Sequence, residues 1–221
     1  MISKKNVFRN AARYLGFRGK ALDAGAIRLL EDAYGALLTT VEPRHILRPF
    51  PVMVTGEKLC FGELPPLESR DLCNLMRGAG EGYGLVATLG TALDLRVRRE
   101  MVMNPALGAA LSACGSAYVD EYIDELLEAE NELCLLRGRR LSPRFSPGYG
   151  DAPLDWQRSL LAVLEARRIG LSLTEGCLML PEKSVSAVMA VRLVDSRRNA
   201  PKSGCAACDL SECAYRREEM E

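Results

Sequence analysis

The sequence predicts an α+β fold in which helices pack around a partly antiparallel β-sheet. Within the first 43 residues, apolar side chains recur at helical spacing. Between Ile46 and Val54 they fall at even positions, which is typical of a strand with one buried face. Near the other end of the chain, apolar runs at 171–180 and 185–194 are separated by the short turn Pro181-Glu182-Lys183. So short a connection requires the two strands to be antiparallel.

The composition excludes several classes of protein. The 221 residues suit one large domain, and the 48% of hydrophobic residues can fill its core. The 29 lysines and arginines balance the 29 aspartates and glutamates, so nucleic acid is not expected as a partner. The start of the chain does not read as a signal peptide, and the stretch 102–119 is too poor in large apolar side chains to span a bilayer. We expect a cytoplasmic protein without membrane contact, whose eight cysteines are free thiols or metal ligands.

Local patterns predict the elements of the first half in order. Two helices come first, the second of them with apolar positions between Ile27 and Val41. A hairpin follows, with strands at 46–54 and 59–61. A helix is expected at 66–77, then a flexible glycine loop at 78–84 and a strand at 85–89. The next helix is expected to open with Thr91 and Asp94 as a capping pair.

A long helix at about 106–136 is expected to begin the second half. Its first half is rich in small side chains, which let another backbone or a ligand come close, and its acidic second half, 120–132, is expected to face water. A loop rich in proline and glycine, 142–153, leads to a helix at 154–167 and the two final strands. We therefore predict one domain at 1–195, whose helical part covers about 1–43, and a cysteine-rich tail at 196–221.

The loop from Arg144 to Asp151 is the most pointed candidate for a binding site. Arg144 offers a two-pronged donor for a carboxylate, and Ser146 and Gly148 flank a rigid turn that exposes backbone groups. Tyr149 offers an aromatic face. The alternative is a structured surface turn without a ligand.

Two further features have a functional and a structural interpretation. Glu175 lies in an apolar run, where a carboxylate is costly without a partner, although alternation could point it to water. Cys205, Cys208 and Cys213 are spaced closely enough to hold zinc or part of an iron–sulfur cluster, although both normally want four ligands. Free or redox-active thiols are the alternative. The other five cysteines are expected to be small buried hydrophobes, and they are Cys60, Cys73, Cys114, Cys134 and Cys177.

Three segments together resemble a known family. They are the loop Arg144 to Asp151, the run Ile169-Gly-Leu-Ser-Leu-Thr-Glu175 and the run Lys183-Ser-Val-Ser186. They resemble the S-adenosylmethionine-binding activation domain of cobalamin-dependent methionine synthase, particularly its free-standing form, a separate bacterial subunit. The N-terminal run from Ala12 to Gly19 and the tail from Cys205 to Arg216 also look like that form.

The resemblance implies a function in trans. Such a subunit would bind S-adenosylmethionine and support the reductive methylation of inactive cob(II)alamin on a partner methionine synthase, with flavodoxin or ferredoxin as the electron donor. By the same resemblance, Arg144, Ser146, Gly148 and Tyr149 would hold the ligand. Glu121 and Glu175 would meet its ammonium group or order the loop.

Departures from the family pattern leave a second hypothesis open. The aromatic residues that follow the last strand in the fused enzyme, where they help to bind adenosine, are replaced by Arg197 and Arg198 here. The tail cysteines have no counterpart in the fused domain, so the alternative is a metal or iron–sulfur module for electron transfer to a corrinoid protein, or for its assembly, without methyl transfer. The only histidine, His45, lies outside any Asp-x-His-x-x-Gly signature, so cobalamin would have to be carried by another polypeptide.

Overall fold

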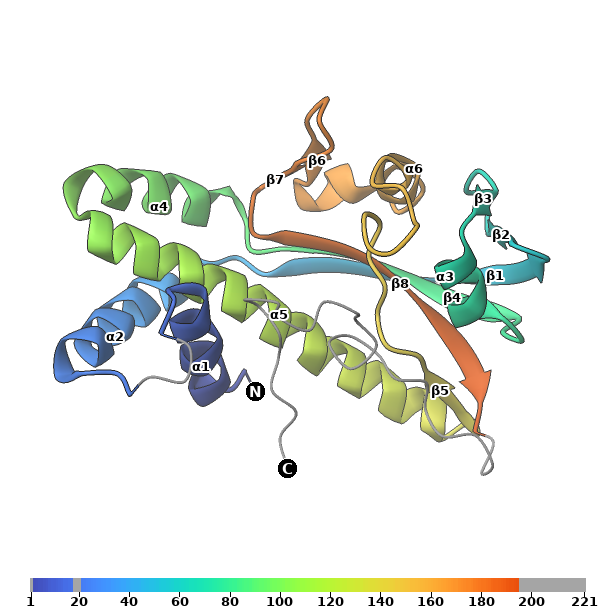
Figure 1. Ribbon diagram of the computed structural model, residues 1–221, viewed down its shortest axis with the longest axis horizontal. Helices are drawn as coiled ribbons and strands as arrows, with labels where there is room; N and C mark the ends of the chain where they lie inside the picture. The colour runs from blue at the N-terminus through green and yellow to red at the C-terminus, as the bar shows by residue number, and fades with distance from the viewer. Residues whose placement is uncertain (1, 18–20, 195–221) are drawn as a thin grey trace.

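A twisted antiparallel sheet forms the centre of the protein, and helices cover both of its faces (Figure 1). The computed structural model describes residues 2–17 and 21–194. In the described part, the strand order of the main sheet is β3-β2-β1-β4-β8-β5, and every pairing is antiparallel. The predicted α+β class is therefore confirmed.

The helices and strands have the following bounds. The helices are α1 (Lys4–Tyr14), α2 (Ala24–Leu38), α3 (Arg70–Met76), α4 (Thr91–Met103), α5 (Pro105–Leu135) and α6 (Trp156–Val163), and a short 3₁₀ helix spans Ala166–Ile169. The strands of the main sheet are β1 (Arg44–Thr55), β2 (Lys58–Phe61), β3 (Leu67–Glu68), β4 (Glu81–Thr88), β5 (Arg139–Leu141) and β8 (Ser184–Leu193). A separate small hairpin consists of β6 (Ser172–Leu173) and β7 (Met179–Leu180).

Local capping explains where several helices begin. The side chains of Ser3, Asp23 and Asn104 each accept a hydrogen bond from a backbone N–H in the first turn of α1, α2 and α5. In α5, Pro105 occupies the first turn, where its missing N–H costs nothing. The result is a helix of 31 residues that crosses the sheet diagonally (Figure 1).

The alternation of β4 and β8 divides the hydrophobic core into two layers. Leu85 and Met189 point to the face that α1, α2, α4 and α5 cover. Val86 and Val188 point to the opposite face, where α3, α6 and the aromatic side chains of β1 and β2 pack. A residue next to a given position in either strand therefore contacts a different set of helices.

The expected hairpin between 171–180 and 185–194 is wrong. A tight turn breaks the first run: the Thr174 carbonyl accepts from the Cys177 N–H (3.1 Å), and the Thr174 Oγ1 accepts from the Leu178 N–H (3.0 Å). The run therefore folds back on itself as β6 and β7, whereas β8 pairs with β4 and β5.

The glycine loop is shorter than expected, because Glu81 to Gly84 belong to β4. Glycine is needed at these strand positions to leave room for aromatic rings. A Cβ at Gly84 would lie 2.9 Å from the Phe50 ring, and one at Gly82 would lie 2.9 Å from the ring of Phe61. The expected helix at 66–77 is also shorter, since β3 precedes α3.

The predicted capping pair of α4 is wrong as well. Gly90 is the N-cap, and it makes no side-chain hydrogen bond to the helix. Asp94 is buried and accepts instead from the backbone N–H of Glu182, at 2.7 Å. Burial raises the pKa of the Asp94 carboxyl, although the Glu182 N–H counteracts this effect.

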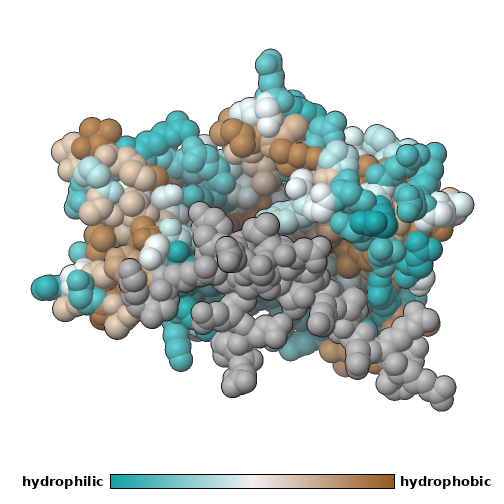
Figure 2. Space-filling model, viewed as in Figure 1, coloured by the Kyte–Doolittle hydropathy of each residue, from teal (hydrophilic) through white to brown (hydrophobic). Residues whose placement is uncertain are grey.

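One end of the molecule exposes apolar side chains where α4 turns into α5. Met101, Val102 and Met103 all lie at the surface there. Hydrophobic surface is visible at that end of the molecule in Figure 2. Of the described residues, no helix combines the length and apolar character needed to cross a membrane.

Candidate functional site

The loop that carries Arg144 begins as an extension of the sheet. Phe145 exchanges two backbone hydrogen bonds with Val188 of β8, at 2.9 and 2.8 Å. Ser142 donates its N–H to the Ala190 carbonyl at 2.8 Å. Because neighbouring side chains of an extended segment point to opposite faces, Phe145 packs with the α6 layer while Arg144 reaches α5.

The other end of the loop is attached to α3 by one carboxylate. Asp151 accepts from the Ser69 hydroxyl (2.5 Å) and from the N–H groups of Arg70 (2.7 Å) and Asp71 (3.2 Å). These N–H groups open α3 and would otherwise lack partners in the helix. The Ser69 hydroxyl, together with the two backbone groups, holds the pKa of Asp151 below its usual value. The loop is thus fixed at both ends.

Arg144 lies between two carboxylates of α5. Its Nη2 is 2.7 Å from Asp120 Oδ1 and 3.6 Å from Asp124 Oδ1. The Arg144 side chain is only 21% exposed, and its Nη1 is buried without a hydrogen-bond partner in the described part of the chain. A buried donor without an acceptor is costly, so this nitrogen is suited to donate a hydrogen bond to an oxygen of a ligand.

Helix α1 holds the acidic residues from the other side. Asp120 also accepts from the Tyr14 hydroxyl at 3.2 Å, and Glu121 accepts from the side-chain amides of Asn6 (3.0 Å) and Asn10 (3.4 Å). Burial and the Asp120 carboxylate raise the pKa of Tyr14, which keeps its hydroxyl a donor. These two acidic residues are therefore paired within the protein, as exceptions in a stretch, 120–132, that was expected to be largely solvated.

The middle of the loop is a tight turn. The Tyr149 N–H donates to the Ser146 carbonyl at 3.3 Å, and the Gly148 N–H donates to the Ala152 carbonyl at 3.0 Å. Gly148 has a φ of +92°, which favours glycine, and Tyr149 is 70% exposed. The structure therefore brings Arg144, Ser146, Gly148 and Tyr149 together on one fixed loop, with Tyr149 at its surface.

Glu175 lies apart from this group. It occupies the turn between β6 and β7, and its carbonyl accepts from Arg158 of α6. Its side chain is exposed and makes no hydrogen bond or ion pair with a described residue. Among the acidic residues predicted for the site, only Glu121 lies next to a partner of Arg144.

The small side chains of α5 make room for parts of the protein. A Cβ at Gly108 would lie 2.6 Å from the Met101 nitrogen, so α4 and α5 are in backbone contact there. Further along, Lys183 extends over Gly115, and its Nζ donates to the hydroxyls of Ser112 and Ser116 at 3.0 Å each. Burial lowers the pKa of this lysine.

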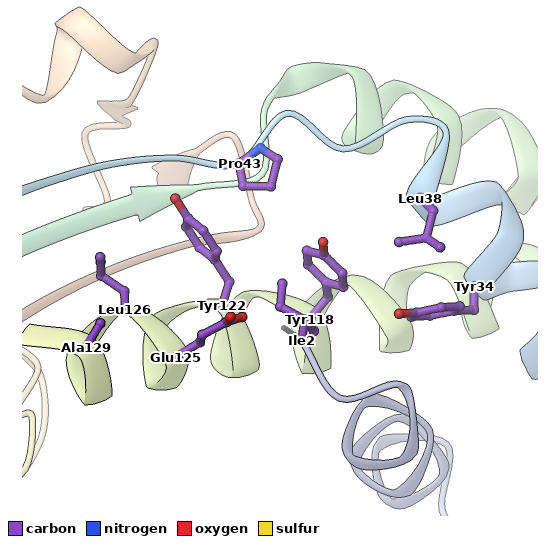
Figure 3. A pocket seen from close by; sticks show the side chains of 9 residues that line it. All are labelled: Ile2, Tyr34, Leu38, Pro43, Tyr118, Tyr122, Glu125, Leu126 and Ala129. Carbon is purple, nitrogen blue, oxygen red and sulfur yellow. The ribbon is translucent and has the colours of Figure 1, made fainter.

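An open groove of about 610 Å³ follows another side of α5 (Figure 3). Three tyrosines, Tyr34, Tyr118 and Tyr122, line it together with apolar residues and Glu125. Tyr118 and Asp120 differ by two positions, which places them about 200° apart around a helix. The groove and the Arg144 loop therefore lie on different flanks of α5.

The structure tests the predictions for five of the eight cysteines, because the other three lie outside the described residues. Cys73, Cys114 and Cys134 are buried as expected, whereas Cys60 and Cys177 are only half-buried. Burial raises the pKa of the Cys114 thiol to about 12, so it is unreactive. The predicted metal ligands Cys205, Cys208 and Cys213 lie outside the described residues. Within 2–17 and 21–194, no cluster of histidine, cysteine, aspartate and glutamate could hold a metal ion.

Comparison with known proteins identifies the fold. No family model and no curated protein matches this chain. Among solved structures, it is similar to the crystal structure of the MetH reactivation domain bound to AdoHcy, with a TM-score of 0.63 over 90% of this chain and 78% of that one. The chain has the fold of the MetH reactivation domain. With 18% sequence identity to that domain, the likeness concerns the fold.

Sequence reasoning missed three side chains that surround Arg144. Asp120 and Asp124 are one helical turn apart and face the guanidinium together, and Tyr14 lies 106 positions before Asp120. The i, i+4 spacing of the two aspartates was a visible signal for a shared cation. No local pattern connects Tyr14 to them, because the contact depends on how α1 packs on α5.

Proposed function

We propose that this protein binds S-adenosylmethionine at the Arg144 loop and supports reductive methylation of cob(II)alamin on a partner methionine synthase. The observation that carries the proposal is the fixed loop itself. In a fold shared with the reactivation domain, it holds a largely buried arginine beside two carboxylates, and the Nη1 of this arginine has no hydrogen-bond partner among the described residues. The solved domain of the same fold holds AdoHcy, the product of methyl transfer from S-adenosylmethionine.

The charges at the loop suit the amino-acid end of that ligand. Its carboxylate would pair with the Arg144 guanidinium, whose Nη1 has no hydrogen-bond partner within residues 2–17 and 21–194. Its ammonium group would take the place of Arg144 beside Asp120, so each charge keeps a partner. The turn from Ser146 to Gly148 would supply backbone contacts, and the exposed ring of Tyr149 could cover the ligand.

The cobalamin would be a substrate on the partner protein. The only histidine, His45, points its Nδ1 at the Tyr122 hydroxyl, 2.6 Å away, and lies outside any cobalamin signature. In the proposed reaction, an external donor supplies one electron to cob(II)alamin, and the methyl group of the sulfonium passes to cobalt. S-adenosylhomocysteine and methylcobalamin are then the products. Within this scheme, Arg144 and Asp120 bind and orient the methyl donor.

Calorimetry with S-adenosylmethionine tests the binding step. We expect the wild type to bind and the Arg144→Ala variant to bind about ten- to a hundredfold more weakly, because hydrogen bonds to a charged group contribute about 1.5–3 kcal/mol. Arg139→Ala is a matched control, since Arg139 forms an exposed ion pair with Glu81 at 2.7 Å. Equal binding by Arg144→Ala and wild type would overturn the proposed site.

A second experiment tests the reaction. The protein, a reductant and S-adenosylmethionine are added to a methionine synthase loaded with cob(II)alamin, and methylcobalamin is followed in the visible spectrum. We expect methylcobalamin only when all components are present. Binding of the ligand without any methylcobalamin would contradict the proposed reaction and leave the binding site standing.

A further inference from the structure

A polar stripe runs along the face of α1 that packs on α5. Asn6, Asn10 and Tyr14 are spaced at i, i+4 and i+8, so they lie on one side of the helix. Asn10 is 8% exposed, which makes it one of the few buried polar residues of the described chain. Each of the three donates a hydrogen bond to Asp120 or Glu121.

Such a stripe is not what packing alone would favour. The same helix buries Val7 and Ala11 completely, so apolar side chains fit the interface between α1 and α5. Burial of polar groups adds little net stability, since their hydrogen bonds mainly offset the loss of water. One of the two carboxylates that receive these bonds, Asp120, also pairs with Arg144, where a ligand would bind, and Glu121 is the next residue of α5.

We propose that α1 is part of the ligand site and that its polar stripe positions Asp120 and Glu121 to receive the ammonium group of an amino-acid ligand. The inference rests on the proposed function, because it assumes a zwitterion held by Arg144. When the ligand carboxylate pairs with the guanidinium, Asp120 gives up its ion pair at 2.7 Å. The Tyr14 hydroxyl still holds the other oxygen, so the carboxylate stays aimed at the site.

Tyr14 is therefore a positioning residue. Its hydroxyl bonds Asp120 Oδ2, whereas Arg144 bonds Oδ1. Without this hydroxyl, the carboxylate could rotate toward Arg144 and compete better with the ligand carboxylate. Removal of the hydroxyl should therefore weaken the binding of ligands that carry an ammonium group, and it should have much less effect on ligands that lack this group.

Paired titrations separate this role from a structural one. S-adenosylhomocysteine and its deamino analogue, which keeps the carboxylate, are titrated by calorimetry into wild type, Tyr14→Phe and Tyr34→Phe. We expect the wild type to prefer the parent compound about tenfold, and Tyr14→Phe to reduce this preference about fivefold, in line with the net contribution of one typical hydrogen bond. Tyr34→Phe also removes a tyrosine hydroxyl, from the neighbouring helix α2, and should leave the preference unchanged.

The outcomes distinguish the two proposals. If the wild type binds neither compound, the proposed function fails and this inference with it. If it binds both equally, or if Tyr14→Phe keeps the full preference, only the role of α1 is overturned. Asn10→Leu gives a second test. It should keep the melting temperature of the wild type or raise it, while it weakens the binding of S-adenosylhomocysteine. A parallel loss of melting temperature and affinity would mean that the stripe is purely structural.

Discussion

Replacing Asp151 by asparagine should loosen the end of the loop that carries Arg144. The carboxylate accepts three hydrogen bonds at the start of α3, from the Ser69 hydroxyl and from the N–H groups of Arg70 and Asp71. An amide has one oxygen to offer and no charge to match the positive end of the helix. Asp151→Asn therefore removes part of a helix cap, and the loop becomes less well fixed.

The expected loss of stability is about 1 kcal/mol at pH 7, the usual cost of losing a helix cap. For a domain of this size, that corresponds to a fall in melting temperature of about 2–4 °C. Asp155→Asn is the matched control, since Asp155 also stands at the start of a helix, α6, but makes no capping hydrogen bond, so its replacement should cost less. Urea unfolding followed by circular dichroism measures both variants against the wild type.

The pH dependence makes the test sharper. The pKa of Asp151 is lowered in the folded protein, chiefly by the Ser69 hydroxyl. A carboxylate of this kind stabilises the fold fully above its unfolded pKa of about 3.9, and the contribution is lost as the pH falls through the lower folded value. The difference in the free energy of unfolding between wild type and Asp151→Asn should be constant from pH 7 to pH 5 and should disappear below about pH 4. Equal unfolding midpoints at pH 7, or a difference that persists in strong acid, would refute the reasoning.

Two further predictions concern the packing of α5. Gly108→Ala places a Cβ 2.6 Å from the Met101 backbone and should destabilise the protein by about 1–3 kcal/mol in urea unfolding. Gly35→Ala is the control: Gly35 has open space around it in α2, so this variant should be more stable than the wild type by about 0.5–1 kcal/mol. Equal effects of the two would show that α4 and α5 are not in close contact. Burial lowers the pKa of Lys183, so the stability of the wild type relative to Lys183→Met should rise between pH 7 and pH 10, as the folded protein loses this proton before the unfolded chain does. A constant difference in unfolding midpoints over that range would contradict the assigned burial of the charge.

Short-range patterns predicted most of the elements, because the information for them lies within a few residues. The β1–β2 hairpin and α5 agree with prediction to within a few residues at each end, and the pairing of β1 with β2 follows from the turn at Gly56. The errors have a common cause. The final hairpin and the cap of α4 were judged from neighbours in sequence, whereas β8 pairs with β4 and Asp94 bonds Glu182.

The sequence by itself determined the α+β class and singled out the Arg144 loop, since a guanidinium next to a Pro-Gly turn is visible in a run of eight residues. Only the tertiary structure decided what surrounds that guanidinium. Asp120 and Tyr14 reach the site because α5 crosses the sheet beside β8 and α1 packs on α5. Such contacts join residues more than 20 positions apart, and their geometry depends on the packing of whole helices, which no local pattern contains.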